Sequence, residues 1–448
     1  MKPADPGPAG PAELALTLAE ERWSTLFPVE DEGATLASWR PPCLVDGIGL
    51  VAAVQLFARE TYRGPSADLV IVPWERLGDA AVELDTLAAI LDGARARGLA
   101  SALEAPLAAT LALEEVRYRE GMFEGPRAEG RRDDALVVTR GRLAGARARM
   151  REVYGLLLPA TLATFAAFWR SLDPLERAGA EHLGRSPGGI MIWFEDGGLA
   201  RRTRDGLDAR LECRFRCDPP ELVTVMWGDS DGLHYGLWYD DPADPPTGVA
   251  HNYARDSAET WRDEEPTPLR VLLAQAQAQI DDPYRDEPAP LSLFAVRDAL
   301  LRFEAADRRA LAEDPPADRW LDAPRIPTLG TFGPALPPEA GTIRVGDPHE
   351  RLPIWRTQPQ RTAKWIASAL RECAEGRPAA ALTFGLDLHW LDREEDREAA
   401  LELMVAAYEA LGRRAHALTI KAHYRHRDLR SVGVFLPPEQ DQGDDTAP

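Results

Sequence analysis

The sequence predicts an α+β protein, because helical and strand patterns occupy separate stretches of its 448 residues. In the stretches 13–118 and 266–313, apolar residues recur three and four positions apart, as on one face of a helix. Residues 188–256 instead hold short runs rich in β-branched and aromatic side chains, which is typical of an antiparallel sheet. We therefore expect an N-terminal helical module, then a helical segment with an antiparallel sheet, and then a C-terminal α/β region.

Composition and periodicity divide the chain into six segments. Both ends lack periodic apolar positions and are expected to be flexible. The predicted segments are a flexible tail at 1–12, a helical N-terminal module at 13–118, a linker at 119–140, helices plus an antiparallel β-sheet at 141–265, a C-terminal α+β domain at 266–436 and a flexible tail at 437–448.

The N-terminal module contains several runs with helical spacing. AELALTLAEERWSTLF at 12–27 and LVAAVQLFARE at 50–60 are predicted helices, and Asp79 after Gly78 is a candidate N-cap for another. The stretch EGMFEGPRAEGRRDDA that follows is charged and lacks periodic apolar positions. It is therefore interpreted as the interdomain linker.

Two helices are predicted around Pro159, and Phe165, Phe168, Trp169 and Leu172 share one face of the second. An Asp-Gly pair within residues 229–232 separates two apolar runs, which indicates a hairpin turn. The five predicted strands are GIMIWFEDG, LDARLECRF, ELVTVMWGD, LHYGLWYDD and TGVAHNYA.

Helical periodicity returns in PLRVLLAQAQAQI and LFAVRDALLRFEAADRRALAE, and a Pro- and Gly-rich stretch then runs from residue 314 to about 358. After it we predict helix TAKWIASALREC, strand AAALTFGLDLHW and helix REEDREAALELMVAAYEALGR. LTIKAHY is either a short strand or a helix.

The overall charge limits the classes of partner. With a net charge of −21 and a pI of about 4.9, the chain repels phosphate backbones and anionic lipids, so direct binding to nucleic acid or membrane is not expected. No stretch approaches the length of an apolar membrane span, and the N-terminal residues, which lack an apolar run, are not expected to direct export. Four scattered cysteines fit a reducing compartment, so we expect a cytoplasmic protein with a protein partner.

Metal and cofactor motifs give weak matches only. Cys213 and Cys217 are spaced C-x3-C, but no second Cys or His pair follows at a suitable distance, so two buried free thiols are the better interpretation. His423 and His426 indicate a solvated basic patch. GIGLVA at 47–52 fits a loose dinucleotide turn without the βαβ alternation that such a turn requires. No metal and no cofactor of its own are therefore expected.

Four ordered segments within residues 145–425 carry a more specific signal. The first is REVYGLLLPATLATFAAFWRSLDP, a helix-LP-helix segment, and the second and most specific runs from Cys217 to Asn252, with DPPE, GD and tyrosine-aspartate-P signatures. The third is the loop PTLGTFGPALPP, and the fourth is ECAEGRPAAALTFGLDLHW, which contains GLDLH. In this order the four segments resemble the histone PARylation factor family, whose pattern has G-M-D-L-F where this chain has GLDLH.

The resemblance implies an accessory factor of protein ADP-ribosylation that does not act as an enzyme alone. Counting back from GLDLH brings Glu375 onto the family's glutamate, which enters the active site of a partner ADP-ribosyltransferase and deprotonates an acceptor serine for attack on the partner's NAD. Arg351 and His389 fall at positions that the resemblance assigns to partner binding. The chain departs from the family pattern at Ala374, where the family has an aspartate.

A second class of function stays open. The segment from Leu158 to Phe165 is also similar to the toxin-immunity and cell-wall-regulator superfamily, which would make the chain a protein-binding module without chemistry. The acidic charge suits that interpretation as well. An independent NAD-using enzyme is the third alternative and depends on the GIGLVA match alone.

Overall fold

The computed structural model describes residues 34–39, 43–45, 49–61, 64–73, 124–282, 289–341 and 346–436. The chain divides into two compact units, Met1–Arg131 and Arg132–Pro448. The predicted tails at 1–12 and 437–448, the helix predicted at 12–27 and the helix predicted after Asp79 lie outside the described residues.

A four-stranded antiparallel sheet forms the described part of the first unit. Its strands are β1 (Ala34–Trp39), β2 (Cys43–Val45), β3 (Gly49–Thr61) and β4 (Gly64–Pro73), and β3 pairs with the other three. The helix predicted at 50–60 is therefore wrong, because this run is the centre of β3. Its pairing with the β-branched run of β4, in continuous register from Ala53 to Thr61, outweighs the local helical spacing.

Helix α4 (Glu124–Val153) occupies most of the segment predicted as a linker. Its buried positions in the second unit include Ala135, Thr139, Ala146 and Met150, which are spaced by four and seven residues. This stripe is narrow and made mainly of small side chains, so the helix has little of the apolar periodicity by which amphipathic helices are recognised.

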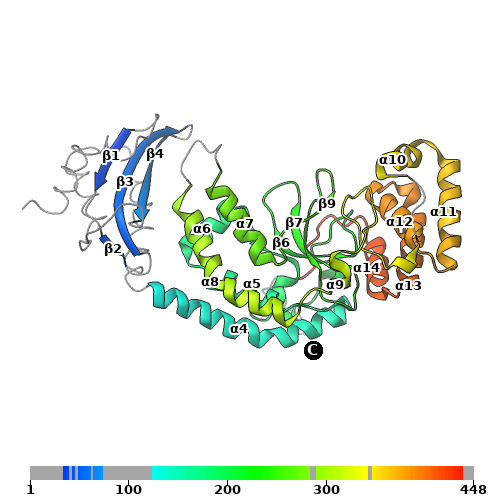
Figure 1. The fold of residues 1–448 in the computed structure, drawn as a ribbon, viewed down its shortest axis with the longest axis horizontal. Helices are drawn as coiled ribbons and strands as arrows, with labels where there is room; N and C mark the ends of the chain where they lie inside the picture. The colour runs from blue at the N-terminus through cyan, green and yellow to red at the C-terminus, as the bar shows by residue number, and fades with distance from the viewer. Residues whose placement is uncertain are drawn as a thin grey trace, which may run out of the picture. The chain divides into compact units, whose positions relative to one another are not determined.

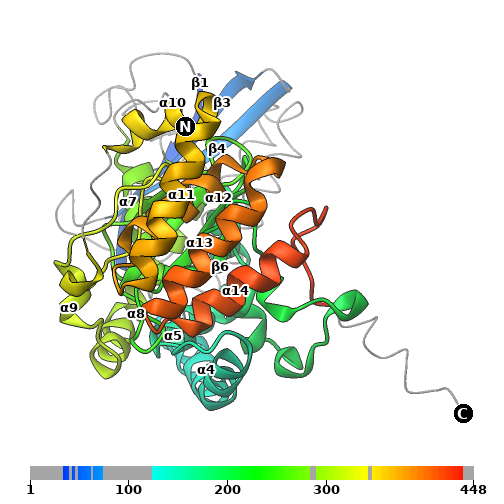
Figure 2. The same ribbon diagram turned by 90° about the vertical axis from the view of Figure 1, so that its right-hand side faces the viewer.

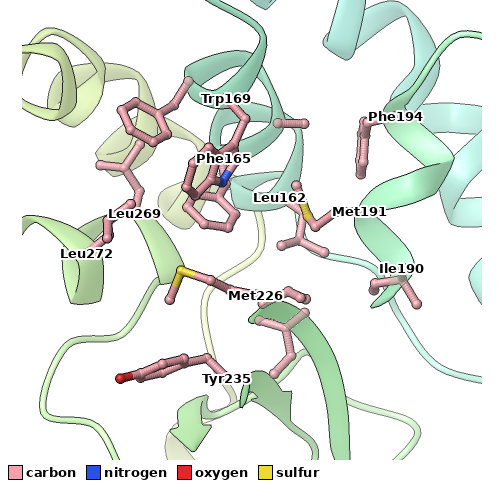
Figure 3. Packing of buried hydrophobic residues seen from close by; sticks show 14 of the residues in the cluster. Leu162, Phe165, Trp169, Ile190, Met191, Phe194, Met226, Tyr235, Leu269 and Leu272 are labelled. Carbon is pink, nitrogen blue, oxygen red and sulfur yellow. The ribbon is translucent and has the colours of Figure 1, made fainter. Parts of the chain in front are cut away.

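A helical layer packs around α5 (Thr161–Ser171), which begins just after Pro159 as predicted. The neighbouring helices are α6 (Pro174–His182), α7 (Pro268–Ile280) and α8 (Leu291–Glu313). The predicted face of Phe165, Phe168, Trp169 and Leu172 is buried, and Figure 3 shows Phe165 and Trp169 meeting Met226 of the sheet and Leu269 of α7. The larger of the two main cores therefore lies between these helices and one face of the sheet.

The second sheet has the order β5-β6-β7-β8-β9 and is antiparallel throughout. Figure 1 labels β6, β7 and β9 of this sheet. Its strands are β5 (Ser186–Pro187), β6 (Leu222–Trp227), β7 (Leu233–Trp238), β8 (Gly248–Tyr253) and β9 (Thr260–Arg262). β6, β7 and β8 confirm three predicted strands. The predicted hairpin turn is also confirmed, because Asp231 and Gly232 both have positive φ and Leu233 N donates to Ser230 O at 2.7 Å.

Two other predicted strands are wrong. GIMIWF forms the 3-10 helix η3 (Gly189–Phe194), and the run 207–215 contains η6 (Ala209–Leu211). At Gly189 φ is +54°, and an added Cβ would lie 2.0 Å from the backbone oxygen of Thr224. This close approach lets η3 bury its apolar side chains as a compact turn against β6. Two short 3-10 helices, η4 (Gly198–Ala200) and η5 (Arg204–Gly206), lie between η3 and η6.

The C-terminal region is a helical layer (Figure 2), which includes α9 (Asp318–Leu321), η7 (Pro338–Ala340), α10 (Pro348–Thr357), α11 (Pro359–Ala374), α12 (Ala379–Leu391), η8 (Glu394–Asp396), α13 (Arg397–Ala410) and α14 (Arg414–Arg425). The strand predicted at 379–390 is wrong, because this run is α12. Helices α11 and α13 both pack against α12, which is buried from Ala379 to His389, so its apolar residues surround the helix and show no period. Segment 418–424, predicted as a strand or a helix, lies in α14.

The overall class agrees with the prediction, since the described residues combine helices with an antiparallel sheet. In the second unit the five-stranded sheet lies between the α5–α8 helices and the C-terminal helices (Figure 1). Among the described residues, we find no helix that is both long and apolar enough to cross a bilayer.

Candidate functional site at the end of helix α11

Glu375 lies at the C-terminal end of α11, where the backbone is tightly fixed. Gly376 has a φ of +85°, its N–H donates to Cys373 O at 3.0 Å, and Arg377 N donates to Glu372 O at 2.9 Å. These two bonds form a Schellman motif, which sets the direction in which the chain leaves the helix. The backbone of Glu375 is therefore held by the helix cap.

The carboxylate of Glu375 faces solvent. Its side chain is 50% exposed and forms an ion pair with Arg377, whose side chain is 49% exposed. An ion pair between two exposed side chains contributes little to stability and exchanges readily with other partners. Glu375 is thus a carboxylate on a rigid backbone that another molecule can reach.

Arg351 lies inside the fold, which corrects its predicted role in partner binding. It lies on α10 with its side chain fully buried, and its Nε donates to Asp387 Oδ2 on α12 at 2.7 Å. Its remaining donors reach Gly346 O at 2.8 Å and Pro327 O at 2.6 Å. With these bonds made inside the fold, this guanidinium joins α10, α12 and the loop before α10.

His389 is also internal, which corrects its assignment to partner binding. It is 1% exposed, and its Nδ1 accepts from Arg427 Nη1 at 3.0 Å. The proton is therefore on Nε2, which donates to Asp218 O at 3.1 Å. Burial, followed by the positive charge of Arg427, holds the pKa of His389 well below its ordinary value. His389 acts as a neutral connector between α12 and the segment before β6.

The three predicted site residues do not form one cluster. Arg351 and His389 are both buried but make separate contacts, Arg351 with Asp387 and His389 with Asp218 O, whereas Glu375 is on the surface at the end of α11. Within the described residues, no hydrogen bond or ion pair joins Glu375 to Arg351 or His389.

The most specific sequence signature, Cys217 to Asn252, supplies buried polar contacts that sequence reasoning did not anticipate. In the DPPE run, Asp218 pairs with His234 Nε2 at 3.1 Å, and Glu221 Oε1 accepts from Tyr408 Oη at 2.7 Å. All four side chains are buried. Charged residues bounding apolar strands could have indicated such internal pairing, because a buried charge requires a partner.

Asp240, two residues after the end of β7, binds more groups than any other residue named in this signature. It accepts from Arg325 Nη1 and Nη2 at 2.7 and 2.8 Å, and from Thr247 Oγ1 at 2.6 Å. Trp238 Nε1 and Ala335 N also donate to it. Burial alone would raise the pKa of Asp240, but hydrogen bonds from Arg325 and its charge hold the pKa below its ordinary value. The signature therefore joins the sheet to the loop that precedes the C-terminal helices.

Glu221 makes the folding stability depend on pH. Burial raises its pKa from 4.5 to about 7. The folded state therefore holds a proton that the unfolded state releases, so stability is full below about pH 4.5 and falls as the pH rises toward 7.

We expect Glu221→Gln to remove this decline, since the amide oxygen can still accept from Tyr408. Above pH 7 the variant should be more stable than the wild type by on the order of 3 kcal/mol, and the two should converge at acidic pH. Urea unfolding at a series of pH values measures this difference. Parallel stability curves for the two proteins would contradict the assignment.

The candidate metal ligands are explained by other contacts. Cys213 and Cys217 are free thiols as predicted, with Cys213 buried and Cys217 half-buried. His423 is buried against His389, which corrects its assignment to a solvated patch, while His426 lines a surface groove with Arg425. Within the described ranges, no group of three His, Cys, Asp or Glu side chains is arranged to hold a metal ion.

The fold and site describe an α+β protein with buried polar contacts between the sheet and the C-terminal region, and with an exposed carboxylate at a helix end. Residues 146–261 match the family model described as Histone PARylation factor 1. Histone PARylation factor 1 of Mus musculus is 31% identical over 112 residues, which cover 24% of this chain and 32% of the mouse protein. Over this segment the chain is similar to histone PARylation factors.

The family match covers the first two of the four resembling segments. It contains the helix α5 region and the Cys217 to Asn252 signature, and it ends before Arg351, Glu375 and His389. The chain spans about a third of the length of the mouse relative. The roles assigned to residues beyond 261 therefore depend on the structure and on the looser sequence resemblance.

Proposed function

We propose that this chain is an accessory factor of protein ADP-ribosylation that binds an ADP-ribosyltransferase and provides Glu375 as a general base. The observation that carries the proposal is the exposed carboxylate of Glu375 on the rigid cap of α11. The relationship of residues 146–261 to Histone PARylation factor 1 supports the same role. Arg351 contributes by joining α10 to α12, and His389 by joining α12 to the segment before β6.

The proposed chemistry needs one proton acceptor. A serine hydroxyl is a poor nucleophile at neutral pH, and a carboxylate within hydrogen-bond reach accepts its proton as the oxygen attacks the ribose anomeric carbon. The bond to nicotinamide breaks as the new oxygen–carbon bond forms. NAD is bound by the partner, so this chain needs only to place Glu375 beside the acceptor serine.

The test uses the full chain with a polymerase-type ADP-ribosyltransferase, NAD and a serine-containing acceptor peptide. We expect the wild type to increase serine modification and Glu375→Gln to lower that rate by at least about 100-fold, as for loss of a general base. Mass spectrometry of the modified residue measures this directly. Binding of the two proteins, measured by calorimetry, should persist in the variant because the substitution removes one exposed carboxylate.

Glu409→Gln is the matched control. Glu409 lies near the end of α13, its side chain is 55% exposed, and it pairs with Lys421 as Glu375 pairs with Arg377. This control should leave serine modification within about twofold of the wild type. Equal modification by the wild type and Glu375→Gln would overturn the role of Glu375. Exclusive capture of a partner without transferase activity would support the immunity-type alternative instead.

A further inference from the structure

A groove of about 610 Å³ lies between the end of α4 and the segment that carries η4, η5 and η6. Its charged lining includes Arg149, Arg201, Arg202 and Arg210, against Glu152 and Asp208. The excess of positive side chains contrasts with the net charge of −21 of the whole chain. A groove lined by more cationic than anionic side chains favours an anionic ligand over a cationic one.

Two of the groove arginines, Arg149 and Arg210, have hydrogen-bonding capacity left over, whereas Arg201 pairs with Glu195 at 2.7 Å. The Nε–H groups of Arg149 and Arg210 are buried without a hydrogen-bond partner among the described residues. Each of these guanidinium groups makes one local ion pair, Arg149 with Glu152 at 2.8 Å and Arg210 with Asp208 at 2.7 Å. Local pairs of this kind, open to solvent on one side, are weak enough for an incoming carboxylate to share.

The wall of the groove is preorganised. Leu436 N donates to Arg202 O at 3.0 Å, and Arg204 N donates to Val434 O at 2.8 Å. These hydrogen bonds to residues 434–436 fix the backbone beside the groove. Leu199 packs closely over Gly145 of α4, where an added Cβ would lie 2.6 Å from its side chain. A binding wall that is already ordered loses less conformational entropy when a ligand arrives.

The groove also has an apolar part. Val153 and Leu207 are buried in its lining, whereas Leu199 keeps 37% of its surface exposed. A simple inorganic anion would leave this part unused. Apolar side chains interspersed with carboxylates would use both parts, and such a pattern belongs to a peptide.

We propose that this groove binds an acidic peptide segment of a partner protein, with carboxylates on the arginines and an apolar side chain against Leu199. All of its lining residues lie within 149–210, inside the segment matched to the family and remote in sequence from Glu375. The inference does not depend on the proposed role of Glu375. It gives the chain a second contact surface for a protein.

The experiment measures fluorescence anisotropy of a labelled peptide that alternates Asp or Glu with Leu, titrated with the full chain. We expect saturable binding that weakens as salt is added, and no binding of a matched peptide with Lys in place of the acidic residues. The double variant Arg149→Ala/Arg210→Ala should weaken binding by about tenfold or more. Leu199→Ser should weaken peptide binding without changing the salt dependence of that binding.

The matched control is Arg140→Ala/Arg308→Ala, which makes the same change in net charge. Both side chains are exposed and form long ion pairs, Arg140 with Glu313 at 4.0 Å and Arg308 with Glu304 at 3.8 Å. Binding within about twofold of the wild type is expected for this control. An equal loss in the control and the double variant would show a diffuse charge effect and overturn the proposal.

Three other results would also overturn it. The first is a lack of saturable binding by the wild type. The second is displacement of the peptide by inorganic pyrophosphate at an equal concentration, which would indicate a phosphate site. The third is much tighter peptide binding after the acidic residues Glu439, Asp441, Asp444 and Asp445 are neutralised, which would identify the chain's own C-terminal segment as the occupant.

Discussion

Replacement of Arg351 with methionine should lower the free energy of unfolding by about 3–5 kcal/mol. The reason is that Asp387 is fully buried, and without Arg351 its negative charge has no counter-charge. Burial already raises the pKa of Asp387, and Arg351 opposes that shift. Urea unfolding followed by tryptophan fluorescence is a suitable measurement, because Trp355 Nε1 donates to the same carboxylate at 3.0 Å.

The controls separate a buried charge from a lost contact. Arg351→Met combined with Asp387→Asn removes both charges and should recover much of the lost stability, since neutral replacement of a buried pair is often tolerated. Arg377→Met breaks an exposed pair and should cost less than about 1 kcal/mol. An Arg351→Met protein within about 1 kcal/mol of the wild type would contradict the structural role assigned to this ion pair.

Replacement of Asp240 with alanine should also lower the free energy of unfolding by about 3–5 kcal/mol. The change leaves Arg325 without its bidentate partner and the buried N–H of Ala335 without an acceptor. Because these bonds join the sheet to the loop before the C-terminal helices, cooperative unfolding of the two regions should weaken as well. Thermal unfolding followed by both near-UV and far-UV circular dichroism tests this.

Asp241→Ala is the neighbouring control. Its carboxylate accepts from Ala243 N at 2.9 Å within a local turn and lies 3.7 Å from the exposed Arg319. Loss of these contacts should cost about 1 kcal/mol or less. If Asp240→Ala were no more destabilising than Asp241→Ala, this would contradict the claim that the hydrogen bonds of Asp240 join the sheet to the loop.

The candidate site was only partly predictable. The position of Glu375 between a helix and the next segment followed from its sequence, and so did its access to solvent, because Glu375-Gly376-Arg377 is a polar helix ending. The inward direction of Arg351 was not predictable. Its partner Asp387 lies 36 residues away, in a run that was predicted to be a strand but forms helix α12. A charged side chain is assigned to the surface by default unless its buried partner is known.

By itself, the sequence determined the features that depend on neighbouring residues. Asp173 before Pro174 starts α6 as an N-cap, and its side chain accepts from Glu176 N. Asp231 with Gly232 makes the β6–β7 turn. These signals act over a few residues, so no distant part of the chain needs to be known.

Only the tertiary structure decided the elements whose form depends on what surrounds them. The run 50–60 is a strand because β4 pairs with it, and 379–390 is a helix because other helices enclose it. The structural role of the DPPE signature likewise depends on its contacts with Tyr408 and His234, which lie on separate elements. A short apolar run fits a strand or a buried helix equally well, and contacts distant in sequence make the choice.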